Sequence, residues 1–540
     1  MSGTRSTGHP QMLKDLQEAA QQDQSERADV VVVGAGIAGL ILSTSLAKSA
    51  VRTIVLESGT ATQAPEPDPL NSVVQVGHSY RGAEYGRVRG LGGTSVRWGG
   101  AMLPFLPCDM EAHTAGWPIH WPITLDQLAP KFSELERLFR LPSGPFEVNN
   151  RGFTERADPA FILRSAKWPL FKRRNVTAAL RQELGAHNPE IWLNATVTDF
   201  RLDGNGRLAG VTAVSPSGAK LTIWAKFVIV AAGAIESTRL LLLLDSQYGN
   251  RIFQPDGQLG HYFYDHLSAP AATIRSTNRV ALNETFGMQF TRSGMRDLRI
   301  EPSRELRSRL GLPGAFARVT ALSNGDDAFA ALRAVYLNRQ SRSPFQLRHL
   351  IRLGRDLGWL MQAMQWRVVK RRLLAPRNSS FELTLVIEQF PHVANNISLA
   401  LDRVDRYGMP LAKIAWRTDP QDSRTFRVLQ SELIAYWNES RFSALGSLEP
   451  TPEHVFLERL QTDSDFFHPG GTTRMGRDVH SGVLDADLRT YRIDNLYVVS
   501  TSAFPSGGGA NPTFMLMAIA LRAAEHVARR VEAFNSALAQ

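Results

Sequence analysis

Two polar side chains near the C-terminus, one imidazole and one amide, stand among glycines and could act on a substrate. His468 opens the segment His468-Pro-Gly-Gly-Thr-Thr-Arg-Met-Gly, and Asn511 lies in Ser506-Gly-Gly-Gly-Ala-Asn-Pro-Thr. Histidine is a candidate base because its ordinary pKa lies close to neutral pH. Two other interpretations stay open: His468 can be a structural residue of a Pro-Gly turn, and Asn511 before Pro512 is a good helix N-cap.

The N-terminal region carries the pattern of a dinucleotide site. Five strand-forming residues, Asp29-Val-Val-Val-Val, run into Gly34-Ala-Gly-Ile-Ala-Gly39, and residues 40–48 continue as a helix. A second apolar run, residues 51–56, ends at an acid 18 residues after Gly39. This order predicts a βαβ unit with a pyrophosphate at the helix N-terminus and the acid on the adenosine ribose. The residues expected to line it are Gly34, Gly36, Ala38, Gly39 and Glu57. The motif alone does not choose between FAD and NAD.

Two further glycine-rich segments complete a recognisable pattern. They are Arg87-Val-Arg-Gly-Leu-Gly-Gly-Thr-Ser-Val-Arg-Trp-Gly-Gly and Phe227-Val-Ile-Val-Ala-Ala-Gly-Ala-Ile-Glu-Ser. With the two segments already described, they stand in the order and spacing of the glucose–methanol–choline (GMC) flavin oxidoreductases, which residues 28–530 resemble. The closing Ser502-Ala-Phe-Pro-Ser-Gly-Gly-Gly-Ala-Asn-Pro-Thr is most similar to the bacterial sugar-oxidising and pyranose-oxidase-like branch.

The resemblance implies FAD, an α/β fold with a discontinuous Rossmann-type FAD-binding domain, and an α+β substrate domain built on an antiparallel sheet. It implies His468 as catalytic base and Asn511 as its partner. The implied FAD contacts, beyond the first glycine turn, are Gly92, Gly93, Thr94, Ser95, Trp98, Val197, Ala232, Gly233, Ser500, Pro512 and Thr513. Some family members attach FAD covalently through a histidine beside the tryptophan; Arg97 stands there in this chain, so non-covalent FAD is expected. Many relatives have an acid where this chain has Ser500.

The segments suggest a domain division. We expect a flexible N-terminal arm at residues 1–27, the first part of the FAD domain at 28–260, the substrate (cap) domain at 261–462, and the C-terminal part of the FAD domain at 463–535. Residues 167–183 suggest a helix, and residues 191–200 and 208–213 suggest strands. Residues 381–389 and 396–402 are predicted strands of the substrate-domain sheet.

Composition limits the remaining alternatives. At 540 residues the chain exceeds a usual single core, which favours two domains. With one cysteine, Cys108, no intrachain disulfide can form. We expect a cytoplasmic protein without a secretory leader, a membrane span or a metal site. The net charge of +10 does not by itself indicate nucleic-acid binding, since no nucleic-acid module is recognisable.

Positive charge is concentrated in residues 342–377. This stretch holds nine Arg or Lys against the single acid Asp356, with Trp359 and Trp366 among leucines. Such a helix could contact a membrane surface through residues 345–374. It could equally pack on the enzyme with its basic face in water, or attract an acidic or phosphorylated substrate.

These features together predict FAD-dependent oxidation of an alcohol group on a carbohydrate or related polyhydroxylated compound. The expected partners are a small alcohol or sugar and an electron acceptor (a quinone, a carrier protein or oxygen), with dehydrogenase favoured over oxidase. The alternatives are a membrane-peripheral enzyme for lipid or sterol alcohols, and a non-redox lyase or isomerase of the same fold.

Overall fold

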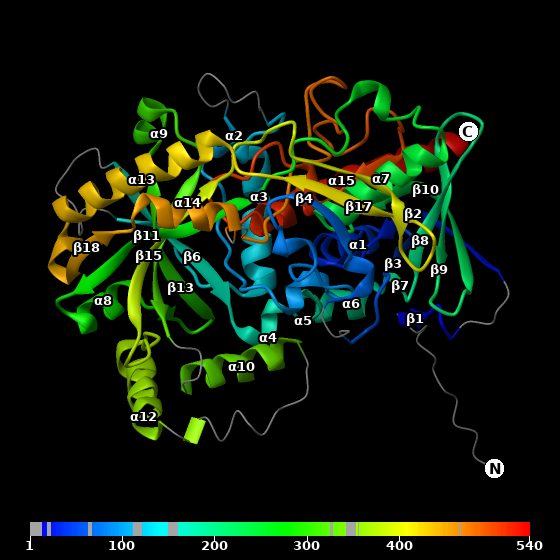
Figure 1. Cartoon of the computed structure of the whole chain (residues 1–540). Helices are drawn as coiled ribbons and strands as arrows, with labels where there is room; N and C mark the ends of the chain where they lie inside the picture. Colours follow the sequence, from blue (N-terminus) through cyan, green and yellow to red (C-terminus); the bar gives the residue numbers. More distant parts are fainter. Residues whose placement is uncertain are drawn as a thin grey trace, which may run out of the picture.

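The computed structural model describes residues 13–18, 23–62, 67–111, 121–149, 160–323, 328–341, 353–354, 356–462, 464 and 466–539. Two large sheets lie side by side, one in each half of the molecule (Figure 1). Each sheet has its own hydrophobic core. The expected division into an α/β unit and a unit on an antiparallel sheet is confirmed.

The first sheet has a parallel centre. Its order is β1-β7-β3-β2-β10-β9-β8, with β19 also paired to β10. The strands are β1 (Leu13–Asp15), β2 (Gln24–Val33), β3 (Thr53–Leu56), β7 (Glu190–Leu193), β8 (Thr196–Leu202), β9 (Leu208–Val214), β10 (Lys220–Val230) and β19 (Leu496–Val498). Residues 30–33 are buried on both faces of the sheet. They therefore form a continuous apolar run rather than an alternating one.

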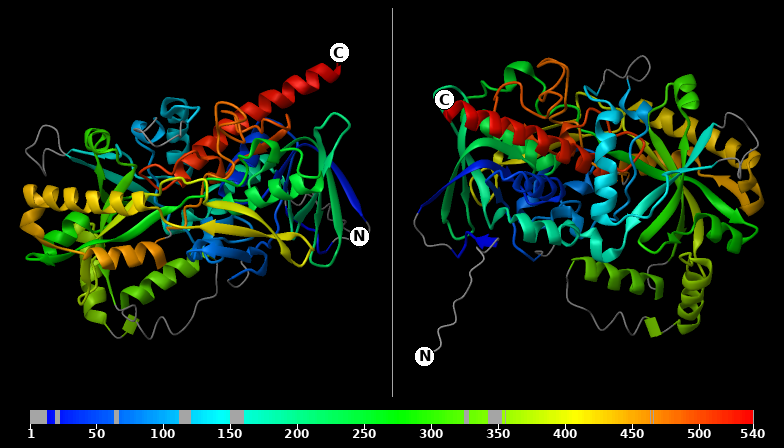
Figure 2. Two further views of the ribbon diagram at one scale, coloured as in Figure 1. Left: turned by 45° about the horizontal axis from the view of Figure 1, so that its top comes forward. Right: turned by 180° about the vertical axis from the view of Figure 1, so that it is seen from behind.

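Helices cover this sheet and bring the C-terminus back to it. The helix α1 (Ile37–Lys48) packs against α15 (Thr513–Ala539), which Figure 2 shows as one long helix across the domain. Because β19 pairs with β10 in parallel, a strand from the C-terminal part of the chain completes the sheet that the N-terminal strands begin. The domain is therefore discontinuous in sequence.

The second sheet is antiparallel, with the order β18-β11-β15-β14-β13-β6-β5 and β12 beside β13. Its strands are β5 (Glu147–Val148), β6 (Phe161–Pro169), β11 (His266–Ser276), β12 (Gln289–Phe290), β13 (Gly294–Pro302), β14 (Ala315–Leu322), β15 (Ser380–Glu388) and β18 (Gly446–Pro450). A small third sheet consists of β16 (Asn396–Val404), β17 (Pro410–Trp416) and β4 (Val73–Gly77), in that order.

The remaining helices are short or lie on the outer faces. They are α2 (Pro107–Met110), α3 (Leu125–Phe139), α4 (Phe171–Arg174), α5 (Val176–Ala179), α6 (Arg181–His187), α7 (Ala234–Gln247), α8 (Arg279–Phe286), α9 (Arg304–Leu310), α10 (Ala328–Ser341), α12 (Leu357–Gln365), α13 (Pro420–Glu439) and α14 (Glu453–Thr462). A π-helical turn, η6 (Trp366–Lys370), continues α12. Within the described part of the chain, no helix combines the length and apolarity needed to cross a membrane.

Four local predictions differ from the structure. Part of the expected arm is ordered, because β1 pairs with β7 and β2 begins at Gln24. Residues 161–169 form β6 of the second sheet, so the chain leaves the first domain within the expected range 28–260. The helix predicted at 167–183 is instead the end of this strand followed by three short helices. The strand predicted at 396–402 exists but pairs with β17 in the third sheet. The local sequence pattern of the three strand segments was compatible with more than one position in the fold. Their pairing with strands distant in sequence determined where each lies.

Candidate active site

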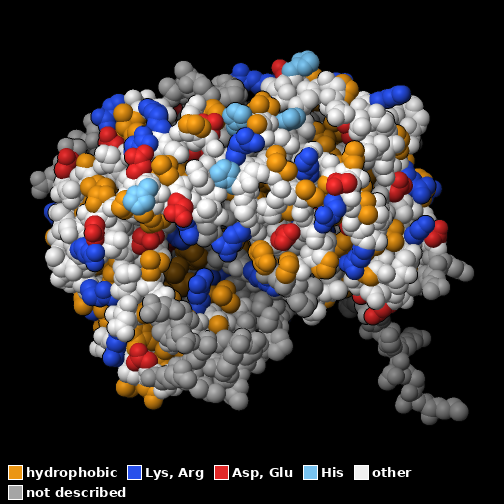
Figure 3. Space-filling model, viewed as in Figure 1, with side chains coloured by type: hydrophobic (Ala, Val, Ile, Leu, Met, Phe, Trp, Pro, Cys, Tyr) orange, Lys and Arg blue, Asp and Glu red, His pale blue; other side chains and the backbone are white. Residues whose placement is uncertain are grey.

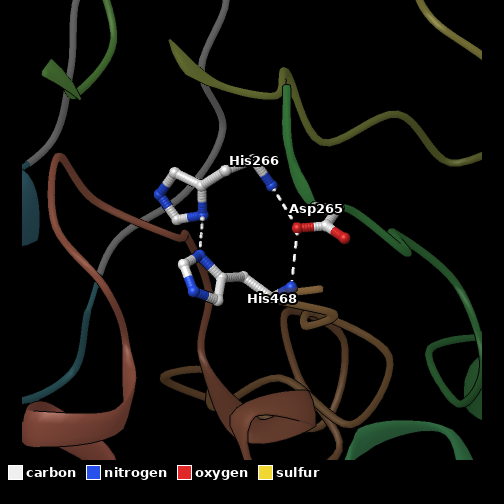
Figure 4. Close-up of side chains that lie close together, drawn as sticks. All are labelled: Asp265, His266 and His468. Atoms are coloured by element: carbon white, nitrogen blue, oxygen red, sulfur yellow. Dashed lines mark hydrogen bonds between the residues drawn. The ribbon is translucent and has the colours of Figure 1, made fainter. Parts of the chain in front are cut away.

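His468 lies where the C-terminal segment passes the beginning of β11. Its backbone N–H donates to Oδ1 of the buried Asp265 at 2.8 Å, and the same oxygen accepts the backbone N–H of His266 (Figure 4). Tyr80 donates its hydroxyl to the other carboxylate oxygen at 2.8 Å. Asp265 thus positions the backbone of both histidines from one point.

The glycines after His468 allow this close approach. A Cβ at Gly470 would lie 2.4 Å from the Tyr264 hydroxyl oxygen, and one at Gly471 would lie 2.1 Å from the Tyr262 carbonyl oxygen. Gly471 also has a φ of +89°, which L side chains rarely adopt. The glycine frame therefore brings the turn against the start of the second sheet.

A chain of hydrogen bonds fixes the tautomer of His468. The Nε2 of His266 lies 2.8 Å from the Gly508 carbonyl oxygen, which can only accept, so Nε2 carries the proton and Nδ1 of neutral His266 is an acceptor. The Nδ1 of His468 lies 3.3 Å from that atom and must be the donor. It follows that Nε2 of His468 has a free electron pair.

Asn511 points its amide at that electron pair. Its Nδ2 lies 3.1 Å from His468 Nε2, and its Oδ1 accepts a 2.7 Å hydrogen bond from Nη2 of Arg299. Since a guanidinium only donates, Arg299 determines which end of the amide faces His468. The first helical bond of α15 is made by the Pro512 carbonyl and the Leu516 N–H. The described contacts of the Asn511 side chain therefore belong to the site, and none of them caps the helix.

The surroundings keep both imidazoles neutral. Burial, the neighbouring His266, and the positive charges of Arg299 and Arg318 hold the pKa of His468 well below its ordinary value. Burial lowers the pKa of His266 to about 4. A neutral imidazole with an available Nε2 is the form that can accept a proton.

Asp265, His266 and His468 place three potential metal-ligating atoms within 4.8 Å of one another. The Oδ1 of Asp265 already accepts two backbone N–H groups, and the two Nδ1 atoms face each other. We interpret the cluster as a hydrogen-bonded network, because these atoms are aimed at protein partners and not at a common point.

The first glycine turn has the shape that a dinucleotide requires. Gly34 has a φ of +107°, and its Cβ would lie 2.7 Å from the Ala231 carbonyl oxygen; a Cβ on Gly39 would lie 1.9 Å from the Gly34 carbonyl oxygen. At Gly36, by contrast, an added Cβ meets nothing within 4 Å. Gly34 and Gly39 are thus packed tightly against the protein backbone, and Gly36 is open. Gly36 stands at the N-terminus of α1, where a pyrophosphate would bind. Ala38 is buried in the first turn of α1.

Glu57 directly follows β3 and is buried beside this turn. Its Oε1 accepts the backbone N–H groups of Gly59 and Gly90, and its Oε2 accepts that of Ala35. Burial raises its pKa, and these N–H groups oppose that shift. Oε2 accepts one such bond and can take a second, so Glu57 both organises the two glycine-rich segments and fits a ribose hydroxyl.

The second glycine segment lies directly on the first. Gly92 and Gly93 have positive φ, and a Cβ on Gly93 would lie 2.8 Å from the Gly36 Cα. Ser95 is fully buried, donates to the Gly92 carbonyl oxygen and accepts the Val176 N–H, which makes it a structural residue of this turn. Thr94 is exposed, and Trp98 donates its indole N–H to the Arg174 carbonyl oxygen at 2.8 Å.

The other expected FAD contacts lie at strand and helix ends. Val197 is in β8; Ala232 and Gly233 lie between β10 and α7, and Gly233 has open space where a Cβ would be. Thr513 begins α15, and Pro512 directly precedes it. Ser500 is buried, with its hydroxyl 2.9 Å from that of Ser502 and accepting the Ser502 N–H. The open glycines at two neighbouring strand ends and the cradle around Glu57 are compatible with FAD.

Three functional candidates were not predicted from the sequence: Asp265, His266 and Arg299. His266 begins β11 and Arg299 lies in β13, with its guanidinium carbon 4.2 Å from the centre of the Phe316 ring. None stands in a glycine-rich motif. The only sequence feature that could have indicated a site was the Asp265-His266 pair at the start of the apolar strand β11, and such a pair is not specific for catalysis.

Comparisons with known proteins found similar oxidoreductases. Residues 391–520 match the family model described as GMC oxidoreductase. The chain is 24% identical to 2-methyl-1,2-propanediol dehydrogenase of Mycolicibacterium austroafricanum (94% of this chain, 96% of the relative) and 24% identical to 6'''-hydroxyparomomycin C oxidase of Streptomyces lividus (94% and 93%). It is 21% identical to the fructose dehydrogenase large subunit of Gluconobacter japonicus (93% and 97%).

Solved structures show the same fold. Pyridoxine 4-oxidase from Mesorbium loti superposes with a TM-score of 0.54 at 18% identity, covering 92% of this chain and 99% of that one. A formate oxidase variant of Aspergillus oryzae RIB40, studied for FAD modification, gives 0.53 at 15% identity (94% and 98%). The likeness to these two structures is one of fold. Residues 391–520 match the GMC oxidoreductase model, and the relatives named above align over most of the chain.

Proposed function

We propose that this protein oxidises a CH–OH group to a carbonyl on a carbohydrate or related polyhydroxylated compound, with non-covalently bound FAD. When bound, FAD supplies the acceptor for the hydride that leaves the carbinol carbon. The observation that carries the proposal is the unprotonated Nε2 of His468 held 3.1 Å from the Asn511 amide. A substrate hydroxyl would replace the direct hydrogen bond between these two groups: it would give its proton to His468 Nε2 and accept a hydrogen bond from the Asn511 amide.

The low pKa of His468 bears on how the proton leaves. A weak base cannot form a free alkoxide from a neutral alcohol, so we expect proton transfer to accompany cleavage of the C–H bond. His266 supports the transfer because its Nδ1 accepts from Nδ1–H of His468 and so holds the tautomer in which Nε2 can take the proton. Asn511 stabilises negative charge as it develops on the substrate oxygen.

Unpaired buried donors support an oxygen-rich substrate. Among the described residues, Nη1 of Arg299 and Nε of Arg318 are buried without a hydrogen-bond partner, and Nε of Arg299 has only Asp297 Oδ2 at 3.8 Å. Buried donors without partners are costly, so these groups favour a ligand that brings several acceptor oxygens. Relatives whose names specify a diol, an aminoglycoside and fructose agree with such a substrate.

We favour a dehydrogenase that passes electrons to a quinone or a carrier protein over an oxidase that uses oxygen. The names of the relatives include both dehydrogenases and oxidases. The acceptor must therefore be identified by experiment. Two acceptors, oxygen and a quinone-type dye, should be compared with each substrate.

The test is a steady-state panel of polyols, sugars, glycosides and lipid alcohols with these acceptors. Turnover of a polyhydroxylated compound with the dye, at least about tenfold faster than with oxygen, is the expected result. Preference for a long-chain or sterol alcohol would contradict the proposed substrate class. Absence of acceptor consumption with every alcohol, in protein that contains FAD, would contradict the oxidation itself.

A further inference from the structure

A long excursion leaves the second sheet between two paired strands. β14 and β15 are in register from Ala315–Ile387 to Leu322–Ser380, and the chain between them spans residues 323–379. The described parts of this excursion include α10 and α12, which lie below the sheet in Figure 1. The whole basic segment at residues 342–377 belongs to this excursion, and its residues 342–352 and 355 lie outside the described part of the chain.

The two tryptophans of α12 and η6 face the protein. Trp359 is 2% exposed, donates its indole N–H to the Ala375 carbonyl oxygen at 3.2 Å and meets the Phe329 ring edge-on. Trp366 is buried as well. Neither tryptophan therefore lies on the outward face of the helix. They instead fix which face of the helix is turned outward.

The outward face of α12 and η6 is apolar. Leu357, Met361, Met364 and Val368 follow one another at helical spacing, and these side chains and that of Val369 are 62–71% exposed. We call these five residues the apolar row. An outward helix face in water is normally polar, and contiguous exposed apolar side chains mark contact surfaces. Figure 3 shows hydrophobic side chains at this lower-left edge of the molecule.

A basic rim borders the apolar row. Arg367, Lys370 and Arg371 are exposed, and the only acid in the described part of residues 353–379, Asp356, accepts the Trp359 N–H at the helix N-terminus. Lys370 pairs with Glu284 at 2.6 Å, which leaves the rim positive overall. Two copies meeting through this face would bring like charges together. The combination of an apolar row and a cationic rim matches an anionic lipid surface.

We propose that this surface docks the enzyme on an anionic lipid bilayer, with the apolar row inserted between headgroups and the basic rim on lipid phosphates. The arrangement is that of a helix lying in the plane of the interface, since no described helix could cross it. The inference stands independently of the reaction, because it uses no residue of the active site.

Binding to vesicles tests the proposal. The FAD-loaded full-length protein is sedimented with vesicles of phosphatidylcholine alone or with 30% phosphatidylglycerol (about one anionic lipid in three, enough for a strongly negative surface), at low and high salt. We expect binding only to the anionic vesicles, weakened by salt. Two triple variants are compared: Met361→Ser, Met364→Ser, Val368→Ser, and Arg367→Gln, Lys370→Gln, Arg371→Asn. Each should weaken binding on the order of 100-fold, since near-surface basic residues contribute about fivefold each and buried apolar side chains at least as much.

Matched controls remove similar groups elsewhere. Val393, Leu401 and Val404 are exposed apolar residues, and Arg403, Arg424 and Arg441 are exposed arginines. Replacing the first three by Ser, or the second three by Gln, should leave binding within about twofold. No sedimentation of wild type at low salt, or equal binding to neutral vesicles, would overturn the proposal. A wild-type dimer in sedimentation velocity that the apolar-row variant converts to a monomer would assign the surface to a second copy instead.

Discussion

The Nδ1 atoms of His468 and His266 lie 3.3 Å apart, and this contact decides which nitrogen of His468 can act as base. His266 can only accept there, because its Nε2 donates to the Gly508 carbonyl oxygen. The arrangement resembles the way a carboxylate orients the histidine of a hydrolase triad, with a neutral imidazole in its place. His266 is thus a positioning residue whose effect on the reaction passes through His468.

Substitutions of His266 test whether this residue sets the tautomer of His468 or only fills space beside it. In His266→Leu the Nδ1–H of His468 loses its acceptor, so the other tautomer becomes accessible and kcat should fall about 10- to 100-fold. Asn offers an oxygen near the position of the histidine Nδ1, so His266→Asn should retain most of the rate. Both are measured by anaerobic rapid mixing with substrate, followed by flavin bleaching. Equal losses in the two variants would indicate a packing role only.

The pH dependence should reflect the depressed pKa of His468. The base is active when neutral, so kcat/KM falls as pH drops through its pKa, and this acid limb should lie well below pH 6.5. Arg318 contributes to the depression by its positive charge. In Arg318→Met the acid limb should therefore move up toward the ordinary histidine value. An unchanged limb, whatever the level of activity, would show that another group titrates.

Much of the fold could be predicted because its signals are local. The strand–glycine–helix–strand–Glu57 order specifies one βαβ unit, and Gly36 stands open where that unit needs a ligand. His468 and Asn511 could be predicted because glycines frame them. Their meeting at 3.1 Å agrees with that prediction, while their catalytic roles remain predictions.

The partners of these residues could not be predicted, because long-range pairing places them. Arg299 reaches Asn511 only because β13 lies beside β14 in the second sheet, and Asp265 meets His468 across 203 residues of sequence. The orientation of α12 is a similar case. Its composition indicated an amphipathic helix, but apolar residues occupy both faces, and only the packing of Trp359 and Trp366 shows which face is outward.

FAD should be bound without a covalent bond, since Arg97 stands where a linking histidine would be. The purified protein should be yellow, and acid or heat precipitation should release free FAD into the supernatant. Flavin that stays with the precipitated polypeptide would contradict this prediction. The measurement is the absorbance spectrum of both fractions.

Gly36→Val provides a test of the cofactor cradle. Gly36 has a φ of −78°, and a Cβ added there meets no atom within 4 Å beyond its chain neighbours, so the variant should fold yet fill the space needed for the pyrophosphate. The protein should be colourless with near-native circular dichroism. Gly185→Val is the matched control, because that glycine is equally open but lies on α6. A yellow Gly36→Val protein would mean that the cofactor binds elsewhere.

The base itself is tested by His468→Ala. A positioned general base contributes about 10² to 10⁴ in rate, so flavin reduction by substrate should slow by that factor. Asn511→Ala should slow reduction and raise KM, because it loses both the orienting contact and a donor to the developing charge. Both variants should stay yellow, since neither side chain is assigned to holding FAD.

The acid limb of the pH profile should flatten in His468→Ala. Reduction at the wild-type rate in that variant would exclude His468 as the base and leave His392 or the exposed His480 to be examined, although neither stands in the glycine-framed network.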